Sequence, residues 1–178
     1  MKYFKHIIIF IFINFLAFSS FANEFVGIIG AGVGEVKNQN NQKLENGSKI
    51  FYGDTIIVGS KSTAQVLFLD QTVMTLGEDS ELTIDEFVYD PQTNDGKFVS
   101  NIKSGTIKII TGKISKKDPD NLEIKIPTGA IGARGTEFVV LANSKNENTV
   151  LLLGPGPNNS LGMTPGNLEV TDGVNSVN

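Results

Sequence analysis

The stretch Leu122–Leu141, LEIKIPTGAIGARGTEFVVL, contains two runs in which apolar and polar residues alternate. Leu122 and Ile124 share one face of the first run, and Phe138 and Val140 share one face of the second. Because successive side chains of a strand point to opposite faces, each run predicts a half-buried β-strand. We therefore expect two core strands joined by the glycine-rich segment between them.

That segment holds the only arginine of the chain, Arg134, between Gly132-Ala133 and Gly135. A guanidinium offers a planar fork of donors that lysine lacks, and glycine permits backbone angles that a Cβ forbids. Arg134 is either an internal clamp that pairs with Glu137, another carboxylate or loop carbonyls, or a contact presented to a partner. We favour the clamp because the segment lies between core strands.

The rest of the chain predicts an all-β fold: a compact β-roll, a short solenoid-like stack or a sandwich of many short strands, with no substantial helix in the mature chain. The candidate strands are rich in Ile, Val, Thr and Phe and are separated by clusters of Gly, Asn, Asp and Ser. They are Phe25–Ile29, Thr55–Val58, Ala64–Leu69, Thr72–Leu76, Glu81–Ile84, Phe87–Tyr89, Phe98–Lys103, Thr106–Thr111, Leu122–Ile126, Thr136–Leu141 and Val150–Leu153.

One internal repeat is present. Val58–Val66 and Leu76–Ile84 share the pattern aliphatic-Gly-x-x-Ser-x-aliphatic/Ala-x-aliphatic. This pattern predicts a rung-like unit in which two strands flank a glycine turn and the serine caps the turn backbone. The alternative is two unrelated hairpin turns of similar chemistry.

Two stretches resemble the FecR domain family. The family has a strand ending in Thr-Pro and then an apolar-Gly-Val-Arg-Gly-Thr-x-Phe run, which Ile131–Phe138 matches except for Ala133 at the valine position; Pro127-Thr128 stands in reversed order. Gly53–Asp70 resembles the family's second stretch, with Asp70-Gln71 where Asp-Gly is common. The resemblance spans about Ile50–Leu141. The motif residues that it singles out are Gly132, Arg134, Gly135, Thr136, Phe138, Gly53 and Asp54.

FecR-like proteins are typically inner-membrane regulators, in which a periplasmic part responds to an outer-membrane receptor and a cytoplasmic tail controls a sigma factor. Only a short leader precedes the apolar stretch here, so the resemblance implies the domain without the sigma-regulator part. We expect a non-catalytic extracytoplasmic module for protein binding and signalling, with an envelope or outer-membrane protein as its partner. The alternative is a carbohydrate-binding or structural module of the cell envelope, although the absence of Trp weakens sugar binding.

Residues 1–22 have the features of a signal peptide. Lys2 and Lys5 precede the apolar run Ile7–Phe18, and Ser20-Phe21-Ala22 ends the segment with small residues where signal peptidase reads. The apolar run is shorter than the roughly 20 residues that a membrane span needs. We expect cleavage after Ala22 and a periplasmic or secreted mature chain without a membrane span.

The composition excludes several kinds of site. The chain has no cysteine, and its one histidine, His6, leaves with the leader. Zinc, copper or haem ligation through nitrogen or sulfur and catalytic triads based on histidine are then unavailable, so we expect no enzyme and no cofactor. The net charge is −4 and becomes two units more negative once Lys2 and Lys5 are lost. An acidic chain is a poor partner for nucleic acid.

Three motifs have a functional and a plain interpretation. Ile28–Gly34 is glycine-rich like a dinucleotide fingerprint, but no helix follows, which favours an edge strand and a turn. Ser100–Lys103 spells Ser-x-x-Lys within a strand pattern, so Lys103 is expected to face solvent. Asp90–Gly96 offers oxygen ligands for calcium, or simply forms a hairpin loop.

The domain organisation follows from these patterns. Residues 23–153 form the FecR-like β domain. Gly154-Pro155-Gly156-Pro157 then interrupts regular structure, and residues 154–178 are expected to be a flexible tail or a linker to a missing region.

Overall fold

The structure is a computed structural model that describes residues 24–143, 147–154 and 166–177; the expected signal peptide lies outside them. The described chain is nearly all β, as predicted. The elements are β1 (Phe25–Val33), β2 (Val36–Asn38), β3 (Lys49–Phe51), β4 (Thr55–Val58), β5 (Thr63–Phe68), β6 (Val73–Leu76), β7 (Glu81–Tyr89), β8 (Gly96–Ile110), α2 (Lys113–Lys117), η1 (Pro119–Asn121), β9 (Leu122–Ile126), β10 (Gly129–Arg134), β11 (Glu137–Ala142), β12 (Asn148–Leu152), β13 (Asn167–Thr171) and β14 (Ser176–Val177).

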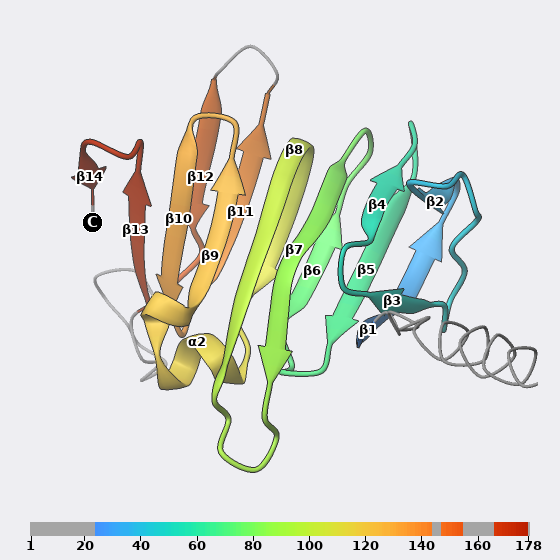
Figure 1. The fold of residues 1–178 in the computed structure, drawn as a ribbon. Helices are drawn as coiled ribbons and strands as arrows, with labels where there is room; N and C mark the ends of the chain where they lie inside the picture. The colour runs from blue at the N-terminus through green and yellow to red at the C-terminus, as the bar shows by residue number, and fades with distance from the viewer. Residues whose placement is uncertain (1–23, 144–146, 155–165, 178) are drawn as a thin grey trace, which may run out of the picture.

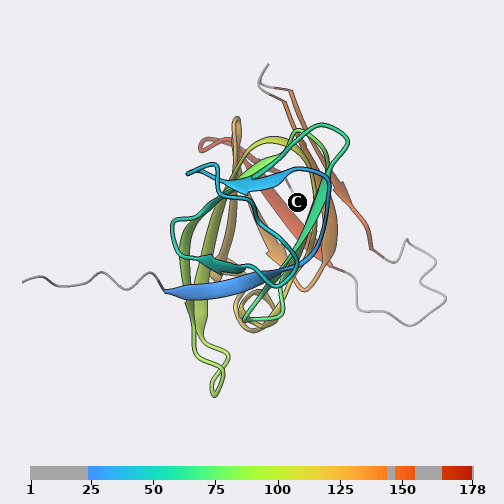
Figure 2. The same cartoon turned by 90° about the vertical axis from the view of Figure 1, so that its right-hand side faces the viewer.

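Strand β8 belongs to two sheets. Its first half pairs with β7 and β9, and its second half pairs with β6 and β11. Sheet A runs β3-β1-β5-β6-β8-β11-β12, and sheet B runs β2-β4-β7-β8-β9-β10-β13-β14. The strands lie side by side along the molecule (Figure 1), and the end-on view shows them wrapped around a common interior (Figure 2). The architecture is therefore a β-roll with two facing layers.

The change of sheet within β8 falls between Ser104 and Gly105. Ser104 pairs with Glu81 in sheet B, and Gly105 pairs with Ala142 in sheet A. Gly105 has a φ of +96°, a conformation that residues with a Cβ rarely adopt. A glycine at this corner thus lets one continuous strand serve both layers.

The core lies between the two sheets and is filled by alternate residues of nearly every strand. Leu122, Ile124 and Ile126 all point inward from β9, as their spacing predicted. Phe68 and Phe98 pack with ring centroids 4.7 Å apart. Burying such side chains contributes roughly 25 cal/mol per Å² of apolar surface, so this alternation is what holds the layers together.

The short helix α2 and the 3-10 turn η1 connect β8 to β9. Both strands then run in the same direction, and β8–β9 is the single parallel pair of the described sheets. Ile114 of α2 is buried and anchors the connection: a Cβ on Gly96 would come within 3.0 Å of it. A parallel pair requires a crossover of this kind, because a tight hairpin only joins antiparallel strands.

The internal repeat forms two matching turns, which supports the rung interpretation. Lys61 and Asp79 occupy equivalent positions, and each has a φ of +54°. Ser62 and Ser80 follow them, and both are buried. The two turns are adjacent, because the Asp79 N–H donates to the Gly59 carbonyl at 3.4 Å.

Each of these serines also packs against a glycine from a distant part of the chain. A Cβ on Gly34 would lie 2.2 Å from the Ser62 hydroxyl oxygen, and one on Gly105 would lie 2.1 Å from that of Ser80. Real Cβ atoms do not approach so closely, so both contacts depend on glycine. The repeated serine therefore marks a repeated close approach of two chain segments.

The prediction that the folded body ends near Leu153 is wrong. Strand β13 pairs with β10 over five residue pairs, from Ala130↔Thr171 to Arg134↔Asn167, and β14 pairs with β13. Leu168 and Val170 of β13 pack against the core. The sequence signal was weak because only these two apolar residues alternate; the strand forms because β10 offers it an edge. Residues 155–165 lie outside the described residues.

Several element boundaries also differ from those expected. Glu81–Ile84 and Phe87–Tyr89 are one strand, β7, with a register shift between Ile84 and Glu86. The glycine-rich β1 is not an edge strand, because it pairs with both β3 and β5, with a register shift between Ile29 and Ala31. Shifts of this kind let one strand continue through residues that read as turns.

Candidate functional site

The motif residues from the sequence lie in two separate places. Gly53 and Asp54 form the turn between β3 and β4, whereas the residues from Gly132 to Phe138 belong to β10, β11 and the turn between them. These two regions lie toward opposite ends of the roll (Figure 1). The structure therefore does not bring the seven residues into one site.

Gly53 and Asp54 have a local structural task. The Asp54 carboxylate accepts hydrogen bonds from the Phe51 N–H at 2.9 Å and from the Gln39 amide at 3.3 Å. Gly53 has a φ of +82°, and its N–H donates to the Ile84 carbonyl at 3.0 Å. The pair thus closes the β3–β4 turn and ties it to β7.

The segment around Arg134 is a strand where a turn was expected. Gly129–Arg134 forms β10, which pairs with β9 on one side and with β13 on the other. Only Gly135 and Thr136 form the connection to β11. Because β10 lies in sheet B and β11 in sheet A, these two residues carry the chain from one layer to the other. Gly135 has a φ of +55° there.

This crossing is held by buried hydroxyl groups. The Thr136 N–H donates to the Thr111 hydroxyl at 2.8 Å, and the Thr136 carbonyl accepts from that hydroxyl at 3.0 Å. Ser115 of α2 donates its hydroxyl to the Ala133 carbonyl and accepts from the Gly135 N–H at 3.4 Å. Thr136 and Phe138 are therefore structural, since Phe138 is fully buried in the core.

Arg134 and Gly132 are on the opposite, outward side of β10. Alternation along the strand buries Ile131 and Ala133 and leaves Arg134 exposed. Among residues 24–143, 147–154 and 166–177, the Arg134 side chain makes no hydrogen bond or ion pair. Glu137, the expected mate, pairs with Lys108 instead.

The Arg134–Glu137 pair, which was one form of the internal clamp, is not formed. Arg134 lies on the outer face of sheet B, whereas the crossing at Gly135 places Glu137 on sheet A. The two side chains are three residues apart in the chain but belong to different layers. Sequence spacing alone gave no sign of this change of sheet.

Gly132 leaves the outer face of β10 bare. A Cβ placed on Gly132 would meet no atom within 4 Å. Its register partners are Glu123 on β9 and Glu169 on β13, so a carboxylate stands on either side of it. We call Ala130, Gly132, Arg134 and these two glutamates the β10 face. It is a smooth strip with acidic borders that ends at one exposed guanidinium.

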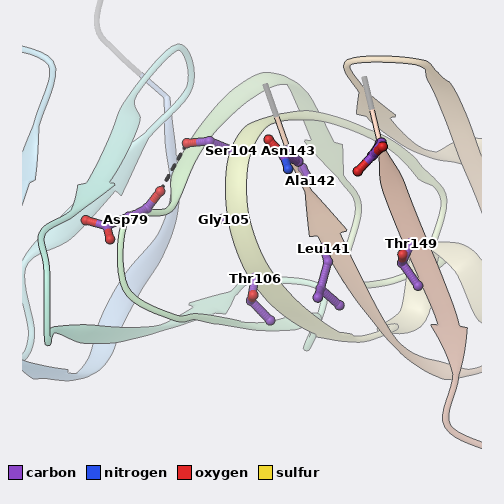
Figure 3. A pocket seen from close by; sticks show the side chains of 9 residues that line it. Asp79, Ser104, Gly105, Thr106, Leu141, Ala142, Asn143 and Thr149 are labelled. Atoms are coloured by element: carbon purple, nitrogen blue, oxygen red, sulfur yellow. Dashed lines mark hydrogen bonds between the residues drawn. The ribbon is translucent and has the colours of Figure 1, made fainter. Parts of the chain in front are cut away.

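A shallow pocket of about 470 Å³ opens at the Gly105 corner (Figure 3). Asp79 and Ser104 border one side, and the Ser104 hydroxyl donates to the Asp79 carbonyl at 3.1 Å. Leu141 and Thr149 border the other side. The Ser104 hydroxyl thus bonds to a backbone carbonyl and not to a carboxylate that could act as a base.

Asp70 is a buried carboxylate that was not among the candidate site residues. It accepts hydrogen bonds from the Thr72 N–H at 3.0 Å and the Thr72 hydroxyl at 2.7 Å, and the Gly112 N–H donates to that hydroxyl at 3.0 Å. Burial raises the pKa of Asp70, although its hydrogen bonds oppose the change. The group joins the β5–β6 turn to the end of β8 and has a structural role.

The plain interpretations of two further motifs agree with the structure. Ser100 lies in the core on β8, and Lys103 points to solvent and pairs with Glu81 at 3.0 Å. Asp90–Gly96 connects β7 and β8 as a hairpin loop. The Asp90 carboxylate accepts from within the loop, from the Gln92 N–H at 2.8 Å. No group of three or more potential metal ligands occurs in the described parts of the chain.

Comparison with known families gives one match. The family model described as FecR protein matches residues 54–154, more than half of the chain. No curated protein and no solved structure matches the chain. Within the described residues, no helix has the length and apolar character needed to cross a membrane.

Proposed function

The chain belongs to the FecR protein family, a family of signalling and regulatory modules, and we propose that it acts as a non-catalytic extracytoplasmic module that binds a protein of the cell envelope. The family implies a membrane-associated partner. We propose an envelope or outer-membrane protein, which contacts the β10 face.

The observation that carries this proposal is the exposure of the Arg134 side chain. A guanidinium that stabilised the fold would be paired, yet this one is exposed and makes no side-chain hydrogen bond or ion pair with the described residues. It is also the only arginine in the chain. An exposed arginine is well suited to a carboxylate of a partner, because its donors engage both oxygens at once.

The bare surface at Gly132 supports the same assignment. Since a Cβ there meets nothing within 4 Å, the fold itself does not require glycine at this position. A partner that lies flat on β10 would require it. Glu123 and Glu169 then flank the contact and give it a polar rim.

The proposed compartment rests on the first 22 residues. Lys2 and Lys5, the apolar run and Ser20-Phe21-Ala22 support secretion with cleavage after Ala22. Mass spectrometry of the secreted chain should give an N-terminus at Asn23. Recovery of the chain with intact Met1 in a membrane fraction would contradict this part of the proposal.

Binding is tested with two substitutions on the β10 face. Arg134→Gln removes the charge, and Gly132→Gln places a side chain on the bare strip. Both should leave the melting temperature unchanged and should each abolish capture of the same envelope protein from a detergent extract. Lys103→Gln is the matched control, because Lys103 is an exposed cation on β8, outside the β10 face. This variant should retain capture.

The results separate a contact from a structural role. Loss of the partner with unchanged melting supports the proposal. If both variants capture the partner as well as the wild type, the β10 face is not the binding surface. A large fall in melting temperature for Arg134→Gln would show that Arg134 stabilises the fold after all.

A further inference from the structure

Strand β12 has an open edge. Among the described strands its only partner is β11, with which it pairs without interruption from Asn148 to Leu152. Its sequence, NTVLL, contains no charge and no proline, and its pairing shows no bulge. Charged residues, proline and bulges are the features by which edge strands normally avoid pairing with other chains. Within residues 24–143, 147–154 and 166–177, no strand pairs with the backbone of β12 on its second side.

The direction of the backbone groups follows from one hydrogen bond. The Leu153 N–H donates to the Glu137 carbonyl of β11 at 2.8 Å. Backbone groups alternate between the two sides of a strand, so Leu151 and Thr149 also face β11. Val150 and Leu152 then direct their N–H and C=O groups to the open edge.

The side chains beside this edge form an apolar strip. Leu141, Leu151 and Leu153 share one face of sheet A and are 46%, 55% and 37% exposed; Leu152, which is 41% exposed, is on the opposite face. Val139 stands opposite Leu151 in register and extends the strip onto β11. Keeping so much apolar surface in water is unfavourable, and such patches mark interaction sites.

The strip suits a second copy of the same chain. In a two-fold interface both partners carry the same charges, and a charge on the axis would face its own copy, so an uncharged segment suits self-association. The chain as a whole has a net charge of −4, yet the segment Thr149–Leu153 has no charge. Different partners are commonly selected by complementary charges, which this segment lacks.

One register fits best. With the two-fold axis at Leu151, that residue faces its own copy, Val150 faces Leu152, and Thr149 faces Leu153. An axis at Val150 would instead set Asn148 against Leu152, a polar group against an apolar one. We propose that β12 pairs antiparallel with β12 of a second copy around Leu151, so that sheet A continues across a dimer.

The oligomeric state tests this directly. In sedimentation equilibrium, the wild-type mass should rise with concentration toward twice that of one chain. Leu151→Lys sets two like charges against each other and should remain monomeric. Leu69→Lys is the matched control, because Leu69 is also exposed, at 47%, but lies between β5 and β6; it should still form dimers.

Cross-linking tests the register. The chain has no cysteine, so Leu151→Cys supplies a single thiol per chain. A disulfide needs Cβ atoms about 4 Å apart, which a directly opposed non-hydrogen-bonded pair provides. Mild oxidation should convert Leu151→Cys, and not Leu69→Cys, into a covalent dimer.

Several outcomes would overturn the proposal: a wild-type monomer at all concentrations, a Leu151→Lys variant that still dimerises, equal cross-linking of the two cysteine variants, or a monomer whose β12 binds a strand of a different protein. Arg134→Gln should dimerise like the wild type. Failure of this proposal is therefore distinguishable from failure of the proposed partner contact at the β10 face.

Discussion

Thr111 and Thr136 are joined by three hydrogen bonds at the point where the chain crosses from sheet B to sheet A. The Thr111 N–H and hydroxyl both donate to the Thr136 carbonyl at 3.0 Å, and the hydroxyl accepts from the Thr136 N–H at 2.8 Å. Both residues are buried, so water does not replace these bonds at low cost.

Thr111→Val should therefore destabilise the protein. The substitution preserves shape but leaves the Thr136 N–H without its acceptor, which costs about 1–3 kcal/mol for a buried donor. Urea unfolding measures the loss. Thr111→Ser keeps the hydroxyl and should lose less; equal losses in the two variants would show that packing of the methyl group matters more than the hydrogen bonds.

The two glycines beside Arg134 should respond differently to alanine. Gly135 has a φ of +55°, so Gly135→Ala should cost about 1 kcal/mol of unfolding free energy. Gly132 has open space around it, and Gly132→Ala should change stability by less than about 0.5 kcal/mol. Thermal melts of the pair give the comparison, and a reversed order would contradict the assigned backbone geometry.

Gln71 offers a stabilising substitution. It lies in the turn between β5 and β6, and its φ is +70°. Gln71→Gly should relieve this strain and raise the unfolding free energy by about 1 kcal/mol. Gln71→Ala keeps the strain, and its denaturation midpoint should stay near that of the wild type. A midpoint for Gln71→Gly no higher than for Gln71→Ala would show that the strain is negligible.

Asp70 should make stability depend on pH. Burial raises its pKa above the reference value of 3.8, so the folded state binds a proton more tightly than the unfolded state. Its contribution is fully present below pH 3.8 and is lost as pH rises through the folded pKa. The unfolding free energy of the wild type, relative to that of Asp70→Asn, should therefore decrease as the pH rises from 3.8 to the pKa of Asp70 in the folded state. Unfolding curves of the two proteins at several pH values across that range measure this difference in unfolding free energy, to which the carboxylates that both proteins share contribute equally. A difference that stays constant or increases with pH would contradict the assignment.

Much of the fold was predictable because the strands alternate cleanly. Leu122, Ile124 and Ile126 read as one buried face and form one. The serine repeat also identified two equivalent turns, since Ser62 and Ser80 take matching buried positions. In these cases the information is local: periodicity and turn chemistry are properties of a few neighbouring residues.

The errors arose where distant pairing decides the structure. The segment Gly129–Arg134 is rich in small residues and reads as a turn, yet β9 and β13 make it a strand from both sides. Likewise, Asn167–Thr171 has little pattern of its own and is ordered by the edge of β10. The exposure of Arg134 depends on the change of sheet at Gly135, which is a tertiary property.

Strand β8 has a consequence for the order in which the roll forms. Both β6 and β7 pair with it, and so do β9 and β11 from later in the chain. While the polypeptide is being synthesised, neither layer can join its earlier strands to its later ones until β8 is available. We expect the β7–β8 hairpin to act as the nucleus on which earlier and later strands assemble, so that the roll is acquired in a single late step rather than layer by layer.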